Sequence, residues 1–118
     1  IVILLVAAFP TYLYLSEENA EKKEIAVKEA QIAEIKSDIR AFFEDFINDL
    51  NSHTDAEGYI EHSEYLKLMT EFTEEYTQYQ NDRIYSLTDD ELKQRAILEM
   101  TLINNEYFSM IAEKVRFE

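Results

Sequence analysis

The chain opens with an almost unbroken apolar run. Residues 1–9 read Ile-Val-Ile-Leu-Leu-Val-Ala-Ala-Phe, and the run continues to Leu15 before acidic residues end it. A helix that is apolar on every side has no face for water, which is typical of a membrane span or of a fully buried helix. We therefore predict a single-pass transmembrane anchor over residues 1–15.

The length of this run leaves alternatives. As a helix it covers ~22 Å, whereas the hydrocarbon core of a bilayer is ~30 Å thick, so we expect the remaining length upstream of Ile1. Tyr12 and Tyr14 suit the headgroup region. The alternatives are a buried core helix of a soluble protein, and the apolar region of a signal peptide. The latter would require a small-residue cleavage pattern, which does not follow Leu15.

The order apolar run, Pro10, one residue, Tyr12 resembles the amino-terminal helix of type IV pilins. This resemblance covers only the first stretch and would imply a sheet-bearing head after it. No later part of the chain shows the alternating pattern of strands.

Residues 16–50 contain no helix breaker and show a heptad-like stripe. The stripe comprises Ile25, Ile32, Ile39 and Phe46 at seven-residue spacing, with Ile35, Phe42, Phe43 and Leu50 beside them. This spacing predicts a helix with a bundle or coiled-coil seam. We expect an exposed stalk first and packing from about Ile25 onward.

A bend is predicted over residues 51–58, which concentrate turn formers and hold the only Gly of the chain. Thr54 and Glu57 stand in capping-box relation and predict a second helix over about 56–80. Its seam is aromatic and comprises Tyr65, Met69, Phe72, Tyr76 and Tyr79. We interpret this stripe as packing or interface residues, because an aromatic stripe at helical spacing more often packs than binds a ligand. Buried Tyr hydroxyls need partners, so we place Tyr76 and Tyr79 at the rim.

Residues 80–87 lose the periodicity and are predicted to form the second connection. Thr88 and Glu91 form another capping box. A seam at helical spacing follows: Ala96, Met100, Ile103, Tyr107 and Met110. We predict a third helix over about 88–115.

These elements predict an all-α fold. It is an up-down-up three-helix bundle over residues 16–118, whose long first helix continues from the anchor. Sensor modules of bacterial receptors resemble this arrangement but often use four helices. A fourth helix from another chain would then complete the core.

The net charge of −14 and the pI near 4.4 argue against nucleic acid as a partner, since binding phosphates requires clustered Lys and Arg. The charge indicates a solvated acidic surface or, alternatively, an acidic docking face for a basic partner. The absence of Cys excludes disulfides, thiolate metal sites and a cysteine nucleophile.

Residues 51–64 resemble the calcium loop of an EF-hand. Counted back from Glu64 as the twelfth position, Gly58 is sixth, Glu57 fifth and Asp55 third, whereas the first position is His53. A loop counted from Asn51 has the greater length of the variant loop in the S100 group. The resemblance implies Asp55, Glu57 and Glu64 as calcium candidates. The alternative is an ordinary bend capped by Thr54, with Gly58 relieving the backbone.

The sequence lacks the residues that other kinds of functional site require. A di-metal bundle site needs Glu-x-x-His pairs, but Leu50 and Tyr59 precede His53 and His62 by three positions. Two His without Cys do not make a zinc site, and one Gly cannot form a phosphate loop. We predict no enzyme, no cofactor and no metal beyond the calcium candidate.

Our functional hypothesis is a membrane-anchored helical interaction module, an accessory or assembly subunit of a larger membrane protein complex. Its partners would be the membrane and other subunits, or further copies of the chain, through helix packing. An extracytoplasmic sensor domain of a receptor is the alternative, and a soluble calcium-responsive protein is a third. Lys22, Lys23 and Lys28 follow the anchor and favour the cytoplasm for the bundle. A short amino end inside the cell would place it outside, which we prefer.

Overall fold

The computed structural model describes the backbone of residues 2–117 and the side chains of residues 20–117. Three helices make up most of it: α1 (Val2–Ser52), α2 (His62–Arg83) and α3 (Asp90–Lys114). Two short strands, β1 (Tyr59–Ile60) and β2 (Arg116–Phe117), complete the element order α1-β1-α2-α3-β2. The predicted all-α, three-helix class is confirmed, since each strand has only two residues.

The chain divides into two compact units, Ile1–Gln31 and Ile32–Glu118. In the first unit, the described side chains of α1 are almost all exposed, including Ile25 at 61% and Val27 at 58%. Packing starts at Ile32, seven residues later than the sequence predicted. Glu24 and Lys28 form an i,i+4 ion pair of 3.6 Å, which supports an exposed helix.

The predicted anchor over residues 1–15 lies outside the residues whose side chains are described. Within the described part of the chain, no helix combines the length and the apolar character that crossing a membrane requires.

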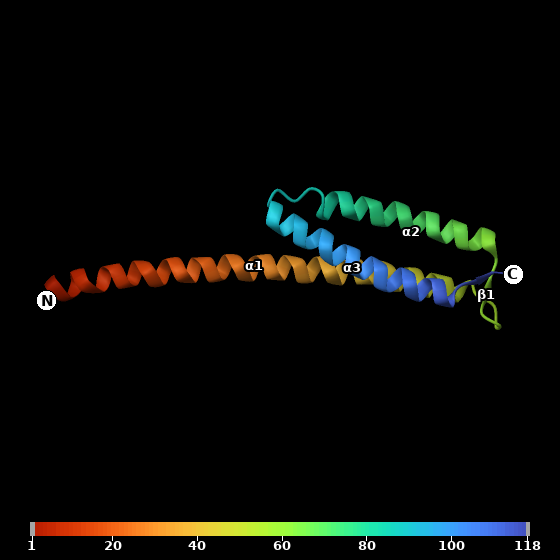
Figure 1. Cartoon of the computed structure of the whole chain (residues 1–118), viewed down its shortest axis with the longest axis horizontal. Coiled ribbons are helices and arrows are strands. Elements are labelled where there is room, and N and C mark those ends of the chain that lie inside the picture. Colours follow the sequence, from red (N-terminus) through yellow and green to blue (C-terminus); the bar gives the residue numbers. More distant parts are fainter. Residues whose placement is uncertain (1, 118) are drawn as a thin grey trace. The chain divides into compact units, whose positions relative to one another are not determined.

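In the second unit, α1 packs against both α2 and α3, and the chain reverses direction between consecutive helices (Figure 1). All three helices contribute to one hydrophobic core. Its buried members on α1 are Ile32, Ile35, Ile39, Phe43, Phe46, Ile47 and Leu50; on α2 they are Leu68, Phe72 and Tyr76; on α3 they are Leu92, Ala96, Met100, Ile103, Tyr107 and Ile111. These positions recur at three- and four-residue spacing, so each helix buries one stripe.

The two connections differ from the sequence-based expectation. Thr54 does not cap the second helix. Its hydroxyl donates to the carbonyl of Leu50 at 2.5 Å and so satisfies the end of α1. As a result, α2 begins at His62 rather than near residue 56. The carboxylate of its N-cap Glu61 caps no backbone N–H and instead accepts from the hydroxyl of Ser63 at 2.9 Å.

The connection between α2 and α3 is shorter than predicted, because α2 continues to Arg83. Ile84, which falls in the predicted loop, is completely buried. The N-cap of α3 is Asp89, not Thr88, and its carboxylate accepts from the backbone N–H of Leu92 at 3.0 Å.

A parallel β pair closes the end of the bundle where α1 ends and α2 begins. Tyr59 pairs with Arg116 and Ile60 with Phe117, so β2 ties the end of α3 to the start of α2. The sequence does not predict this pair, since two residues are too few to show an alternating pattern. Ile60 is only 2% exposed, which anchors the pair to the core.

Candidate interaction surface

Phe43 is the centre of an aromatic cluster that joins the three helices. Its ring is completely buried and stacks on Tyr107 of α3 with centroids 4.9 Å apart and planes 10° from parallel. Phe72 of α2 lies 5.1 Å away, and Phe108 of α3 meets the ring edge-on at 5.2 Å. Such pairs add to the free energy that area burial supplies. The cluster fixes how α2 and α3 lie on α1.

Polar contacts bind α1 to both other helices. The hydroxyl of Tyr79 donates to Asp38 at 2.9 Å, and that of Tyr107 donates to Glu44 at 2.7 Å. Burial, and then the hydrogen bond to the carboxylate, raise the pKa of each of these two hydroxyls, because a charged phenolate would face a negative acceptor. Arg83 of α2 also pairs with Glu34 at 3.0 Å.

Ion pairs of α3 likewise point toward α1. Lys36 and Glu99 lie 3.6 Å apart, and Arg40 and Glu106 lie 3.4 Å apart. All four side chains are partly exposed, so these pairs contribute little to the free energy of unfolding. They place Glu99 and Glu106 on the side of α3 toward α1.

The side of α2 and α3 that lies away from α1 has a different character. At 100° per residue, one sector of α2 holds no Asp, Glu, Lys or Arg. The facing sector of α3 holds none from residue 94 onward, although Asp90 in the first turn of α3 falls on the same side. We call this surface the neutral face. It comprises His62, Leu66, Met69, Thr70, Thr73, Thr77 and Gln80 of α2, and Gln94, Ile97, Thr101, Asn104, Phe108 and Ala112 of α3.

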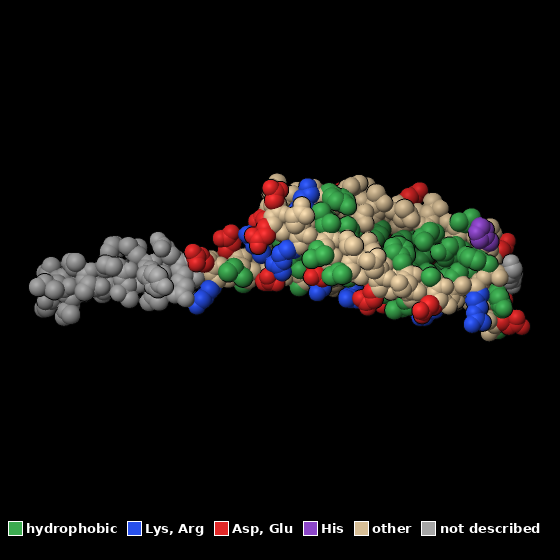
Figure 2. Space-filling model, in the orientation of Figure 1, with side chains coloured by type: hydrophobic (Ala, Val, Ile, Leu, Met, Phe, Trp, Pro, Cys, Tyr) green, Lys and Arg blue, Asp and Glu red, His purple; other side chains and the backbone are tan. Residues whose placement is uncertain are grey.

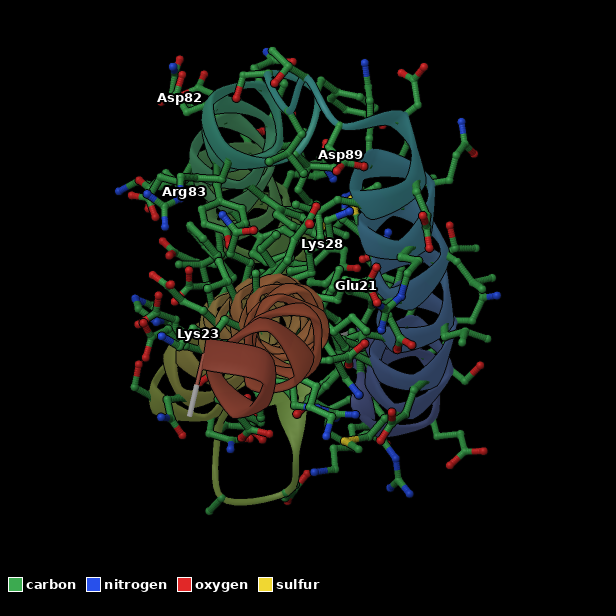
Figure 3. The ribbon with its side chains drawn as sticks, turned by 90° about the vertical axis from the view of Figure 1, so that its left-hand side faces the viewer. Glu21, Lys23, Lys28, Asp82, Arg83 and Asp89 are labelled. Atoms are coloured by element: carbon green, nitrogen blue, oxygen red, sulfur yellow. The ribbon has the colours of Figure 1, made fainter. Side chains whose placement is uncertain are left out.

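Contacts between the helices orient this surface. The Tyr76 hydroxyl donates to Asn104 Oδ1 at 2.5 Å, so the Asn104 side of α3 is turned toward α2. The opposite side of α2 carries Glu71 and Glu75, which line a shallow groove with Asp45 and Asp49 of α1. Figure 3 shows Asp82 and Arg83 pointing from α2 away from α3. These charged side chains of α2 therefore lie toward α1 or away from α3, and the neutral face lies on the outer side of α2 and α3.

One end of the neutral face is apolar. Leu66 is 50% exposed and Phe108 is 40% exposed, although Phe108 also contacts the buried Phe43. Phe117 of β2, 45% exposed, meets the rings of His62 and Tyr65 edge-on at 5.0 and 5.2 Å. Figure 2 shows a continuous hydrophobic area over this half of the second unit, with acidic and basic side chains around its edges.

A surface of this composition is suited to being covered by protein. Charged groups lose hydration when an interface forms, and the centres of protein interfaces are depleted of them. Charged residues make up 31% of the chain. If they were distributed at random, several would fall on two adjacent helix sectors. A protein surface that covers the neutral face and leaves Asp90, at the start of α3, in water would therefore desolvate no Asp, Glu, Lys or Arg.

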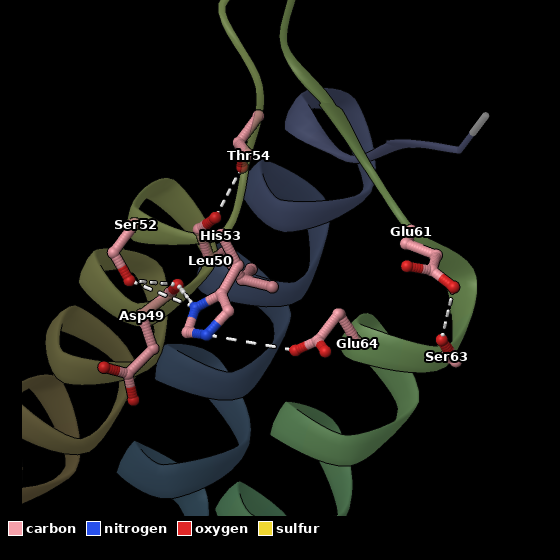
Figure 4. A network of polar contacts seen from close by, with 8 residues as sticks. All are labelled: Asp49, Leu50, Ser52, His53, Thr54, Glu61, Ser63 and Glu64. Carbon is pink, nitrogen blue, oxygen red and sulfur yellow. Dashed lines mark hydrogen bonds and ion pairs between the residues drawn. The ribbon is translucent and has the colours of Figure 1, made fainter.

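The calcium candidates do not form a cluster. The Asp55 carboxylate accepts from the backbone N–H groups of Glu57 and Tyr59, both at 2.9 Å, and so stabilises the turn. Glu64 lies on α2, with a carboxylate oxygen 3.9 Å from Nε2 of His53 (Figure 4). Among the described residues, no group of three or more His, Asp or Glu is placed to hold a metal ion.

The loop network instead ends α1. Ser52 Oγ donates to the Asp49 carbonyl at 2.8 Å, and Nδ1 of His53 lies 2.9 Å from the same oxygen (Figure 4). Gly58 has φ +90°, a conformation that L side chains rarely adopt. These observations describe a bend, as in the alternative interpretation of residues 51–64, although Thr54 caps α1 rather than α2.

A small cavity of about 250 Å³ lies beside this bend, between the ends of α1 and α3. Its lining is mainly apolar and comprises Ile47, Leu50, Asn51, Thr54, Gly58, Ile60, Ile111, Lys114 and Val115. The volume is near the lower limit of small-molecule sites.

The residues of the predicted packing stripe on α2 are buried to different degrees. Phe72 and Tyr76 are buried, and Tyr76 lies deeper than the rim position we predicted for it. Tyr65, Met69 and Tyr79 are partly buried against the core. The neutral face was missed, because its residues are individually ordinary. Plotting the charged residues of the second and third helices on helical wheels could have revealed it.

Comparison with known proteins adds no assignment to this surface. The chain matches no protein-family model, and neither a curated protein nor a solved structure shows significant similarity to it.

Proposed function

We propose that this protein is a membrane-anchored helical interaction module, an accessory or assembly subunit of a larger membrane protein complex. The observation that carries the proposal is the neutral face on a chain of net charge −14. Covering it by a partner would bury Leu66, Phe108 and Phe117 and would leave the carboxylates of α1 in water. The apolar run over residues 1–15 supports the membrane part of the proposal.

The interaction can be tested by cross-linking, because residues 1–118 contain no Cys. A photoreactive group is attached to Thr73→Cys on the neutral face, in the full-length protein within its native membranes. The matched control is Asn48→Cys, an exposed position on α1. We expect a protein adduct from position 73 and little from position 48. Recovery of the uncross-linked chain alone from position 73 would contradict the interaction.

The membrane part has a separate test. High-speed centrifugation of full-length protein without detergent should leave it in the pellet, and washing with alkaline carbonate should not release it. Protein that remains dissolved would contradict the anchor but would leave the neutral face as an interaction surface. The bundle's preferred side, outside the cytoplasm, is tested by protease digestion of intact cells, where residues 20–118 should be cut.

A second candidate function, a ligand-responsive sensor domain, is favoured by the cavity beside the bend. Apolar walls and a single cation, Lys114, suit a short aliphatic carboxylate or alcohol. Hexanoate and hexanol at millimolar concentration should then raise the melting temperature of the full chain. An unchanged melting temperature with both compounds would remove this candidate.

A further inference from the structure

The distribution of charge on the surface indicates what the neutral face binds. We propose that it binds a second copy of the same chain, to form a homodimer in which α2 and α3 of each copy pack together. This inference rests on the proposed interaction function and names its partner.

The distribution of charge favours a second copy over a basic partner. A site for a basic partner would present carboxylates around its contact area, and this chain has many to offer. Four of them lie toward α1 instead: Glu71 and Glu75 line a groove with α1, and Glu99 and Glu106 pair with it. Two chains that each carry −14 repel each other least where they meet through a surface with few charges. The remaining charges, including Asp90 at the start of α3, lie at the edges, and ions screen much of the repulsion between charges more than a Debye length of about 8 Å apart.

The polar groups of the neutral face are also self-complementary. In a twofold-symmetric dimer the same patch meets itself, so every donor and acceptor on it must find its partner among the groups of that patch. Hydroxyl and amide groups can do so, since each both donates and accepts, whereas a carboxylate only accepts and a lysine only donates. The polar members of the neutral face are hydroxyls, amides and the His62 side chain. Thr70 and Thr101 already donate to backbone carbonyls at 2.8 Å, and their oxygens can still accept.

The area of the neutral face also fits a dimer interface. The 22 residues of α2 span about 33 Å, and α3 is slightly longer. Two such helices about 10 Å apart present roughly 700 Å² in projection, close to the ~800 Å² per partner of a standard interface. Its apolar end, with Leu66 and Phe108, supplies hydrophobic area, and the Thr and Gln side chains supply a neutral polar remainder.

The test uses disulfide cross-linking, which starts from a chain without Cys. Four single variants on the neutral face, Thr70→Cys, Thr73→Cys, Thr77→Cys and Thr101→Cys, are oxidised in the full-length protein in its membranes. Asn48→Cys is the control off the face. We expect a covalent dimer, at twice the mass of the chain, from at least one face position near the symmetry axis, because disulfides form only between Cα atoms within about 7 Å. The control should give at least tenfold less.

The response of the dimer yield to salt shows whether charge opposes or favours the dimer. Raising NaCl from 20 to 500 mM should increase the yield of dimer several-fold, because it screens the repulsion of two acidic chains. A dimer held by opposite charges would respond in the opposite direction, which would overturn the electrostatic argument. Thr73→Glu should lower dimer yield at Thr101→Cys at least tenfold, whereas Asn48→Glu, with the same added charge, should not. Circular dichroism checks that both variants remain helical.

The outcomes separate this inference from the proposed function. If photo-cross-linking from position 73 gives adducts with other proteins and no face position gives a dimer, the homodimer is overturned and the interaction function stands. If neither method gives an adduct, both are overturned. Equal dimer yield from the face and from position 48 would also overturn the homodimer, since it would indicate random collision.

Discussion

The hydroxyl of Tyr76 in α2 donates a 2.5 Å hydrogen bond to Oδ1 of Asn104 in α3. Tyr76 is 5% exposed, and its ring also packs on Phe43 of α1 at 5.4 Å. A neutral bond therefore links α2 to α3 directly beneath the neutral face, while charged pairs link each of these helices to α1.

Tyr76→Phe removes that bond and keeps the ring. We expect the free energy of unfolding to fall by about 1 kcal/mol, since Asn104 is partly exposed and water can replace the lost donor. Urea denaturation of the full chain measures it. Tyr85→Phe, at a residue 45% exposed, is the control and should change the value by less than about 0.5 kcal/mol. Equal effects of the two substitutions would contradict the hydrogen bond.

Alkaline pH should destabilise the fold. Burial raises the pKa of the Tyr76 hydroxyl to about 12, from an ordinary value of about 10. Below pH 10 both the folded and the unfolded state are protonated, and stability is fully present. As the pH rises from 10 through 12, the unfolded chain ionises first, so the free energy of unfolding falls, by at most about 3 kcal/mol for this residue.

Tyr76→Phe provides the control for this pH dependence. Its free energy of unfolding should fall less steeply than that of the natural sequence between pH 10 and 12, because one raised pKa is absent. Urea unfolding at pH 8, 10, 11 and 12, with tyrosinate absorbance as a second readout, tests this. Parallel curves for the two proteins would show that Tyr76 does not contribute.

Phe43→Ala should be among the most destabilising single substitutions in the described part of the chain. The side chain is fully buried and contacts the rings of Phe72, Tyr76, Tyr107 and Phe108. We expect a loss of about 3–5 kcal/mol, from lost transfer free energy and the cavity left behind. Thermal or urea unfolding measures it. Leu102→Ala, at a site 55% exposed, should cost about 0.5 kcal/mol or less.

The N-caps of α3 and α2 differ in their hydrogen bonds, and substitutions at the two positions can be compared. Asp89→Ala removes a carboxylate that accepts from Leu92 N–H and should cost about 1 kcal/mol. Glu61→Ala, at the corresponding cap of α2, removes no such bond and should cost less than half as much. Thr88→Ala distinguishes the structure from the capping box predicted by sequence. A loss at Thr88 as large as that at Asp89 would contradict the observed cap.

Gly58→Ala tests the bend. The new Cβ would meet no atom within 4 Å, so any cost comes from the backbone, whose φ is +90°. We expect about 1–2 kcal/mol. Gly58→Asn should cost less, because Asn tolerates positive φ better than Ala. If both variants were as stable as the natural sequence, the turn would differ from the one described.

Much of the fold could be predicted from local pattern. Ile32, Ile39 and Phe46 recur every seven residues, and all three are buried. Ile25 continues the same spacing but is exposed, because burial also requires a partner helix, and periodicity does not say where the partner begins. Thr54 shows the same limit. Its spacing to Glu57 fits a cap for a following helix, but its hydroxyl bonds to the helix before it.

The order of residues alone determined that the chain is helical, that its helices carry apolar stripes, and that its composition is strongly acidic. These properties depend on propensity and on spacing within one segment. The tertiary structure decided that Ile84 is buried, that Asp55 serves a turn, and that the sectors of α2 and α3 that form the neutral face, about thirty residues apart, lie side by side. The physical reason is that such a surface depends on how far each helix is rotated about its own axis relative to its neighbours. Packing around Phe43 sets that rotation, and the residue pattern within a single helix does not determine it.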